Sequence, residues 1–165
     1  MTLKTKKIAV MALAVALAMI LSFVESQIPP LTAIPGVKIG LANIVVIFVL
    51  YKLGWKQAVI ISLLRVFLVS VLFGNFAALL YSLAGAVLSL LGMILLKKTS
   101  RFSQTAVSIA GGVLHNIGQI IMACILLETN VIAYYLPFLI ISGIVSGTAV
   151  GLVSALLVKR INVRL

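Results

Sequence analysis

The sequence is poor in acidic and metal-binding side chains. Its 165 residues include no aspartate, and the only acidic residues are Glu25 and Glu128. Cys124 is the single cysteine and His115 the single histidine. One thiol excludes an intramolecular disulfide and a cysteine-ligated metal centre. Two glutamates and one histidine also provide too few ligands for the usual metal sites, so we expect none.

Apolar residues, in contrast, are present in large excess. Hydrophobic residues make up 64% of the chain and charged residues only 9%. A soluble domain contains roughly 45–50% apolar and about 25% charged residues. The core of a small soluble domain cannot bury this much apolar surface, so the sequence predicts an integral membrane protein.

The apolar residues are divided into segments long enough to cross a bilayer. A transmembrane helix needs about 20 predominantly apolar residues, and charged or turn-forming residues separate six such segments. These span approximately residues 8–24, 38–54, 57–73, 76–96, 104–127 and 132–158. The sequence therefore predicts an all-α, polytopic membrane protein with six transmembrane helices in one domain, residues 1–165. No small-residue cleavage site follows the first segment, so we interpret it as a retained helix and not as a signal peptide.

The positions of the basic residues predict the topology. With a cytoplasmic N-terminus, eleven of the 13 basic residues lie on the cytoplasmic side. Only Lys38 lies on the outer side, together with both glutamates. This partition follows the positive-inside rule and predicts that both termini are cytoplasmic. The net charge of +11 is thus explained by topology, and we expect no nucleic-acid partner.

Small residues recur at helical spacing on two predicted helices. Gly143, Gly147 and Gly151 form a stripe on the sixth helix that lets another backbone approach closely, and packing within the protein is the favoured interpretation. The first helix has two overlapping pairs of small residues, formed by Ala12, Ala14, Ala16 and Ala18. This alanine strip fits internal packing and docking of a partner membrane subunit equally well.

Arg65 is the remaining basic residue and lies inside the third predicted helix. It is nine residues after Lys56, which places it about 13 Å into the bilayer at 1.5 Å per residue. A guanidinium at that depth must face the protein interior or water. It either anchors the fold, by binding backbone carbonyls or pairing with Glu25, or it holds an anion or polar head group of a ligand.

The fifth predicted helix carries the sequence HNIGQ at residues 115–119. His115 and Gln119 are four residues apart and share one helical face, and Asn116 is adjacent. A single histidine in a membrane helix is often a packing residue. Three hydrogen-bonding side chains at one depth instead indicate the polar end of a binding site.

The segment from residue 29 to 43, PPLTAIPGVKIGLAN, contains three of the four prolines and precedes the second helix. Its prolines prevent regular helix until about Val37. It is either a rigid connector or a lid that places Lys38 and Asn43 at the mouth of a cavity. Tyr134 and Tyr135 begin the last helix, where they belong to an aromatic belt or close the same cavity.

The unusual polar residues all fall at the midplane or in the predicted outer half of the membrane, which predicts a ligand-binding site that opens outward. This candidate site comprises Glu25, Lys38, Asn43, Arg65, Asn75, His115, Asn116, Gln119, Tyr134 and Tyr135.

Several of these motifs together resemble a known bacterial family. They are Glu25, PGVKIGLAN at 35–43, Arg65, YSLAG at 81–85, HNIGQ at 115–119 and YYLP at 134–137. Their combination is similar to the family called heptaprenyl diphosphate synthase component I, or Gx transporter. A more distant similarity, in size, topology and the Ala-rich first helix, links the chain to the S components of energy-coupling factor (ECF) transporters. The resemblance implies a bacterial plasma-membrane protein with an S-component-like helix bundle.

The two family labels imply different functions. An S component binds a small vitamin-like ligand from the outer face and docks a transmembrane coupling subunit, here through the alanine strip. The chain has no Walker A loop, so ATP would be hydrolysed only by partner ATPase subunits, and the chain itself needs no cofactor. The synthase label instead implies a membrane accessory subunit of prenyl diphosphate or quinone synthesis. Since aspartate is absent, we expect the chain itself not to be an enzyme and to have no catalytic residues.

Overall fold

The computed structural model describes residues 3–28 and 40–162, and these residues form an all-α fold. Lys38 lies outside the described residues. The elements are α1 (Leu3–Gln27), α2 (Leu41–Lys52), α3 (Trp55–Phe73), α4 (Phe76–Lys98), α5 (Gln104–Leu126), a short 3-10 helix η1 (Val131–Tyr135) and α6 (Leu136–Arg160). The predicted fold class is confirmed, and each predicted transmembrane segment corresponds to one α-helix.

Local sequence explains where several helices begin. Asn75 precedes α4, and its side-chain oxygen accepts a hydrogen bond from the Ala78 N–H at 2.8 Å. Ser103 caps α5 in the same way, with its hydroxyl accepting from the Ala106 N–H at 3.1 Å. Such side chains satisfy backbone donors that have no partner within the helix. Before α2, Gly40 adopts a φ of 78°, a backbone conformation that glycine tolerates without strain.

The second helix is shorter than the sequence predicted. The apolar segment 38–54 indicated a full transmembrane helix, but α2 has only 12 residues, or about 18 Å at 1.5 Å per residue. The hydrocarbon core is about 30 Å thick. The described residues therefore contain five helices long and apolar enough to cross a membrane and one short apolar helix.

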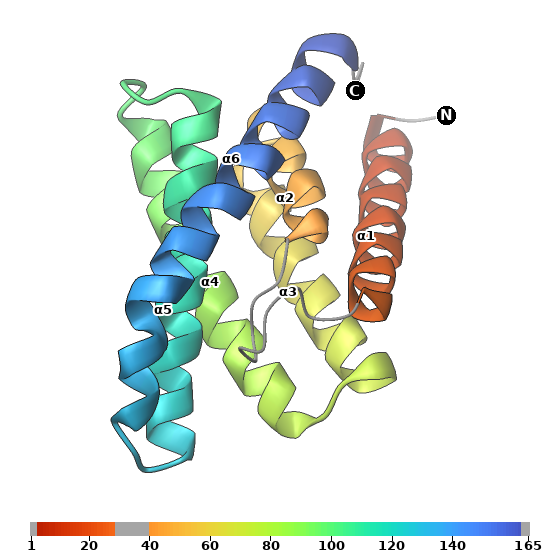
Figure 1. The fold of residues 1–165 in the computed structure, drawn as a ribbon. Coiled ribbons are helices and arrows are strands. Elements are labelled where there is room, and N and C mark those ends of the chain that lie inside the picture. The colour runs from red at the N-terminus through yellow and green to blue at the C-terminus, as the bar shows by residue number, and fades with distance from the viewer. Residues whose placement is uncertain (1–2, 29–39, 163–165) are drawn as a thin grey trace.

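The helices are arranged in two groups (Figure 1). In the view shown, α4, α5 and α6 lie together on one side, and α1, α2 and α3 lie on the other. The most extensive packing is between α5 and its two neighbours, α4 and α6. Contacts between α3 and α4 and between α2 and α6 join the groups. Helix α1 begins and α6 ends at the same end of the bundle, here called the terminal end.

The glycine stripe of α6 packs inside the protein, as predicted. A Cβ atom added at Gly147 would lie 2.7 Å from Cα of Ile109 on α5, and one at Gly143 would lie 3.0 Å from the backbone of Gly112. The Ser108 hydroxyl also donates to the Gly147 carbonyl oxygen at 2.7 Å. Close backbone approach and a hydrogen bond between helices therefore hold α5 against α6.

The hydrophobic core lies around α2. Ile47 and Leu50 on this helix are fully buried, and they pack in one cluster with Ala14 and Ala18 of α1. Ala12 and Ala16 face outward. The predicted alanine strip thus has two faces, one in the core and one that remains accessible to a partner.

At the terminal end, Lys97 ties α4 to the end of α2. Its ammonium group donates to the Leu50 carbonyl oxygen and lies 4.9 Å from the centre of the Tyr51 ring. The lysine therefore satisfies one of the carbonyl groups left without a partner at the C-terminal end of the short helix, and it interacts favourably with the ring.

Candidate functional site: a polar pocket inside the bundle

A pocket of about 230 Å³ lies inside the bundle and is lined by residues from all six α-helices. Helix α1 contributes only its last turns and α2 only its first half, whereas α3 contributes its C-terminal half. These parts lie away from the terminal end (Figure 1). On these three helices the pocket occupies the middle of the bundle and the half opposite the termini, whereas Met93 of α4 and Ser108 of α5 extend it towards the terminal end.

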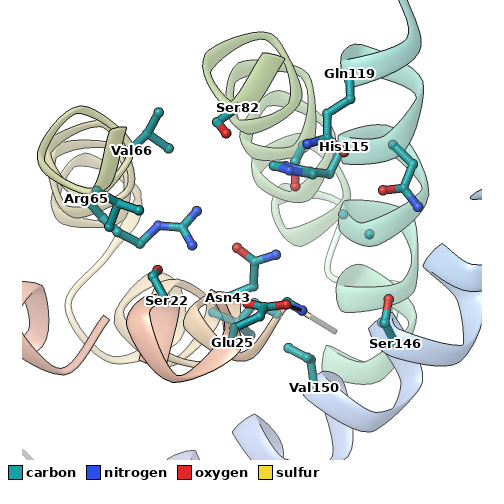
Figure 2. Close-up of a pocket in the computed structure, with 18 of the residues that line it drawn as sticks. Ser22, Glu25, Asn43, Arg65, Val66, Ser82, His115, Gln119, Ser146 and Val150 are labelled. Atoms are coloured by element: carbon teal, nitrogen blue, oxygen red, sulfur yellow. Dashed lines mark hydrogen bonds between the residues drawn. The ribbon is translucent and has the colours of Figure 1, made fainter. Parts of the chain in front are cut away.

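Arg65 extends from α3 towards the middle of this pocket (Figure 2). It is ten residues after Trp55, the first residue of α3, and so about 15 Å along the helix axis. Its Nε atom is buried and has no hydrogen-bond partner among the described residues. Of the two structural roles considered for Arg65, the interaction with Glu25 is present as an electrostatic one, whereas Nε donates to no carbonyl oxygen of the described residues.

Glu25 joins the end of α1 to the start of α2. Its Oε1 atom accepts a hydrogen bond from the Gly40 N–H at 2.5 Å, and its carboxylate lies close enough to Arg65 to interact with it electrostatically. The bond to Gly40 fixes the start of α2, and hence the position of Asn43, whose side chain lines the pocket. Glu25 thus serves both the fold and the pocket.

The opposite wall is the face of α5 that carries the HNIGQ motif. His115 and Gln119 both line the pocket, as their spacing predicted (Figure 2). Gly85 of α4 makes room for the histidine, since a Cβ at this position would lie 2.9 Å from Cε1 and 3.0 Å from Nδ1 of the ring. This contact gives the YSLAG motif a physical role, because its glycine permits the imidazole to pack between α4 and α5.

Asn116 lines the pocket and also holds the fold together. Its amide donates to the Leu139 carbonyl oxygen on α6 at 2.6 Å, and the residue is buried. From the sequence, Asn116 was predicted to contact a ligand. In the structure, one of its two N–H donors is already used in the hydrogen bond between α5 and α6.

Three predicted site residues of the described chain do not line the pocket. Asn75 is exposed and caps α4. Tyr134 and Tyr135 lie in η1 and are also exposed. The pocket brings together Glu25, Asn43, Arg65, His115, Asn116 and Gln119.

Sequence reasoning missed the serines that supply many of the remaining polar groups. The lining serines are Ser22, Ser26, Ser70, Ser82, Ser89, Ser108 and Ser146. One signal was available, because Ser22, Glu25 and Ser26 are three and four residues apart and therefore share a helical face. The others were isolated serines in apolar helices, where a hydroxyl often bonds its own backbone.

The pocket offers hydrogen-bond donors and acceptors around a small volume. The described residues contain no group of three or more histidine, cysteine, aspartate or glutamate side chains that could hold a metal ion. The lining groups instead offer a guanidinium, a carboxylate, amides, an imidazole and hydroxyls. A few polar groups converging on one pocket are characteristic of small-molecule binding sites.

Comparison with known proteins supports one of the two family relationships. No curated protein and no solved structure matches the chain, so the similarity to ECF S components rests on sequence features alone. The family model for heptaprenyl diphosphate synthase component I matches residues 14–157, nearly the whole chain. The chain therefore belongs to the heptaprenyl diphosphate synthase component I family.

Proposed function

We propose that this membrane protein binds a small ligand in the pocket and supports its uptake from the outer face of the bacterial plasma membrane. The proposal rests mainly on Arg65, whose side chain is directed into the pocket (Figure 2). Its buried Nε atom has no hydrogen-bond partner among the described residues. The expected ligand is a vitamin or a small isoprenoid- or quinone-related compound that has a group able to accept hydrogen bonds.

The Nε donor of Arg65 is unsatisfied among the described residues, and this costs free energy. A buried donor without a partner costs about 1–3 kcal/mol, and more when it belongs to a charged group. A ligand that accepts hydrogen bonds from the guanidinium recovers this energy and gains the strength of a charge-assisted bond. Asn43 and Gln119 line the same pocket and would orient the ligand by further directional bonds.

The size of the cavity limits what it can hold. At about 30 Å³ for each water-sized group, the volume of 230 Å³ accommodates roughly eight non-hydrogen atoms. A small metabolite or a polar head group fits this space. A complete heptaprenyl chain is several times larger, so a long isoprenoid would place only its head group here.

The direction of uptake follows from the expected topology. With both termini in the cytoplasm, the half of the bundle that contains Glu25 and the start of α2 lies on the outer side. Ala12 and Ala16 on the exposed face of α1 would be available to a transmembrane coupling subunit. Partner ATPase subunits would supply the energy, since the chain has no nucleotide-binding motif of its own.

Native mass spectrometry of the purified protein tests the proposal. The expected result is one non-lipid molecule bound to wild-type protein and absent from the Arg65→Gln variant. Arg101→Gln is the matched control, because Arg101 is exposed in the connection between α4 and α5 and should retain the ligand. If wild type carries only bulk phospholipid, or if Arg65→Gln retains the ligand fully, the proposed site is wrong.

A second candidate function follows from the family description. In this alternative, the chain is a non-catalytic membrane subunit that presents a prenyl substrate to a soluble partner synthase, and its basic terminal end forms the contact. Co-purification distinguishes the two functions. Coupling and ATPase subunits bound to the protein favour uptake, whereas a prenyltransferase favours the accessory role.

A further inference from the structure

The pocket contains two opposite charges that do not form an ion pair with each other. Among the described lining residues, Arg65 is the only lysine or arginine and Glu25 the only acidic residue. The two side chains interact electrostatically, but the Arg65 Nε donates no hydrogen bond to Glu25 or to any other described residue. The pocket therefore presents a separated positive and negative pole.

Each pole retains capacity for a bond. A guanidinium has five N–H donors, and the one on Nε of Arg65 is buried without a partner in the described segments. A carboxylate has two acceptor oxygens; on Glu25, Oε1 accepts from the Gly40 N–H, and Oε2 is the second acceptor. Separated charges in a site of low dielectric constant interact strongly with any charge placed between them.

Building on the proposed uptake function, we infer that the ligand is a small zwitterion. Its anionic group accepts hydrogen bonds from the Arg65 guanidinium, and its cationic N–H group donates to the Glu25 carboxylate. A purely anionic ligand would be repelled by Glu25, and a purely cationic one by Arg65. A zwitterion satisfies both poles at once and leaves the pocket electrically neutral.

The available volume agrees with this ligand class. Space for roughly eight non-hydrogen atoms in about 230 Å³ matches a short amino acid with separated charged ends. Asn43 is positioned beside this space by the bond between Glu25 and Gly40, since it lies three residues after Gly40 at the start of α2. Its amide can therefore bond the polar atoms of the same small molecule.

A matched series of probes tests the inference with the intact protein in detergent. The probes are glycine, β-alanine and γ-aminobutyrate, which increase the distance between the charges, with butyrate and butylamine as singly charged controls. Binding is measured by ligand-observed NMR. One zwitterion should bind wild type at least about tenfold more tightly than either control, because each charge-assisted hydrogen bond changes affinity by roughly one to two orders of magnitude.

Variants then separate the two poles. Glu25→Gln keeps an oxygen that can accept from Gly40 and should abolish the preference for the zwitterion over butyrate. Arg65→Gln should weaken the binding of the zwitterion and of butyrate at least about tenfold. Glu128→Gln is the matched control, because this exposed glutamate lies outside the pocket and should leave the preference unchanged.

The possible failures are distinguishable. If butyrate binds wild type as tightly as the zwitterions and Glu25→Gln has no effect, the pocket is a simple anion site; the inference is then overturned and the proposed function stands. If no probe binds, the inference is tested by the molecule that native mass spectrometry finds in the wild-type protein. A molecule that carries both charges supports the inference, and one that lacks either charge overturns it. Absence of any non-lipid ligand overturns the inference and the proposed function together.

Discussion

Replacing Gly147 by alanine should destabilise the protein by forcing α5 and α6 apart. The added Cβ would lie 2.7 Å from Cα of Ile109 and 3.0 Å from the Ser108 carbonyl oxygen. Carbon atoms in contact normally lie about 3.5–4.0 Å apart. Both neighbours are backbone atoms, so no side-chain rotation can relieve the overlap.

The expected magnitude follows from three contributions. Overpacking of a close contact typically costs about 1–3 kcal/mol. Displacement also weakens the 2.7 Å hydrogen bond from Ser108 to the Gly147 carbonyl, and a bond of this kind between membrane helices contributes about 0.6 kcal/mol. Alanine is a better helix former than glycine by up to about 1 kcal/mol. The net loss should be about 0.6–2.6 kcal/mol.

An equilibrium titration with SDS in mixed micelles measures this loss, and the fluorescence of the single tryptophan, Trp55, provides the signal. Gly92→Ala is the matched control in α4. Its Cβ would meet Cδ1 of Leu114, the far end of a flexible side chain that can turn away. The control should leave stability unchanged or raise it by up to about 1 kcal/mol, because alanine is also the better helix former at this position. Equal stabilities of wild type and Gly147→Ala would refute the assigned role of the glycine stripe.

Three further experiments test the site, the fold and the topology. Gly85→Ala should weaken ligand binding, because the added Cβ would lie 2.8 Å from the His115 carbonyl oxygen and 2.9 Å from Cε1 of its ring and so displace this part of α5 from the wall of the pocket; unchanged affinity in a titration with the isolated ligand would contradict this. Asn116→Ala should lower stability in the SDS titration by about 0.6–1.7 kcal/mol, because it removes a buried bond between α5 and α6, and unaltered unfolding would refute this role. In a background without the native cysteine, cysteine at position 128 should react with a membrane-impermeant thiol reagent in intact cells and cysteine at position 101 should not; the reverse pattern would invert the topology.

The sequence predicted the helices well because the membrane imposes strict physical requirements. Each helix must be apolar over its spanning length, and charged residues mark its ends, so α3 (Trp55–Phe73) was expected at 57–73. The glycine spacing also revealed the packing face of α6. The short length of α2 could not be predicted in this way, because an apolar sequence continues past its ends and hydropathy alone does not show where the helix begins.

The site was predicted only in part, for reasons that depend on individual residues. Arg65 and His115 were identifiable because charged or titratable groups are costly inside a membrane. Asn75 was assigned to the site although its amide caps α4, a local role that depends on backbone geometry at the helix start. Tyr134 and Tyr135 have the right depth but belong to η1, outside the pocket.

A ligand-bound experimental structure of the wild-type protein in a lipid nanodisc tests the central claim most directly. The account predicts compact, non-lipid density in the pocket, within hydrogen-bonding distance of the Arg65 guanidinium and close to Asn43. A pocket filled by a lipid acyl chain, or one closed by a direct ion pair between Arg65 and Glu25, would contradict it.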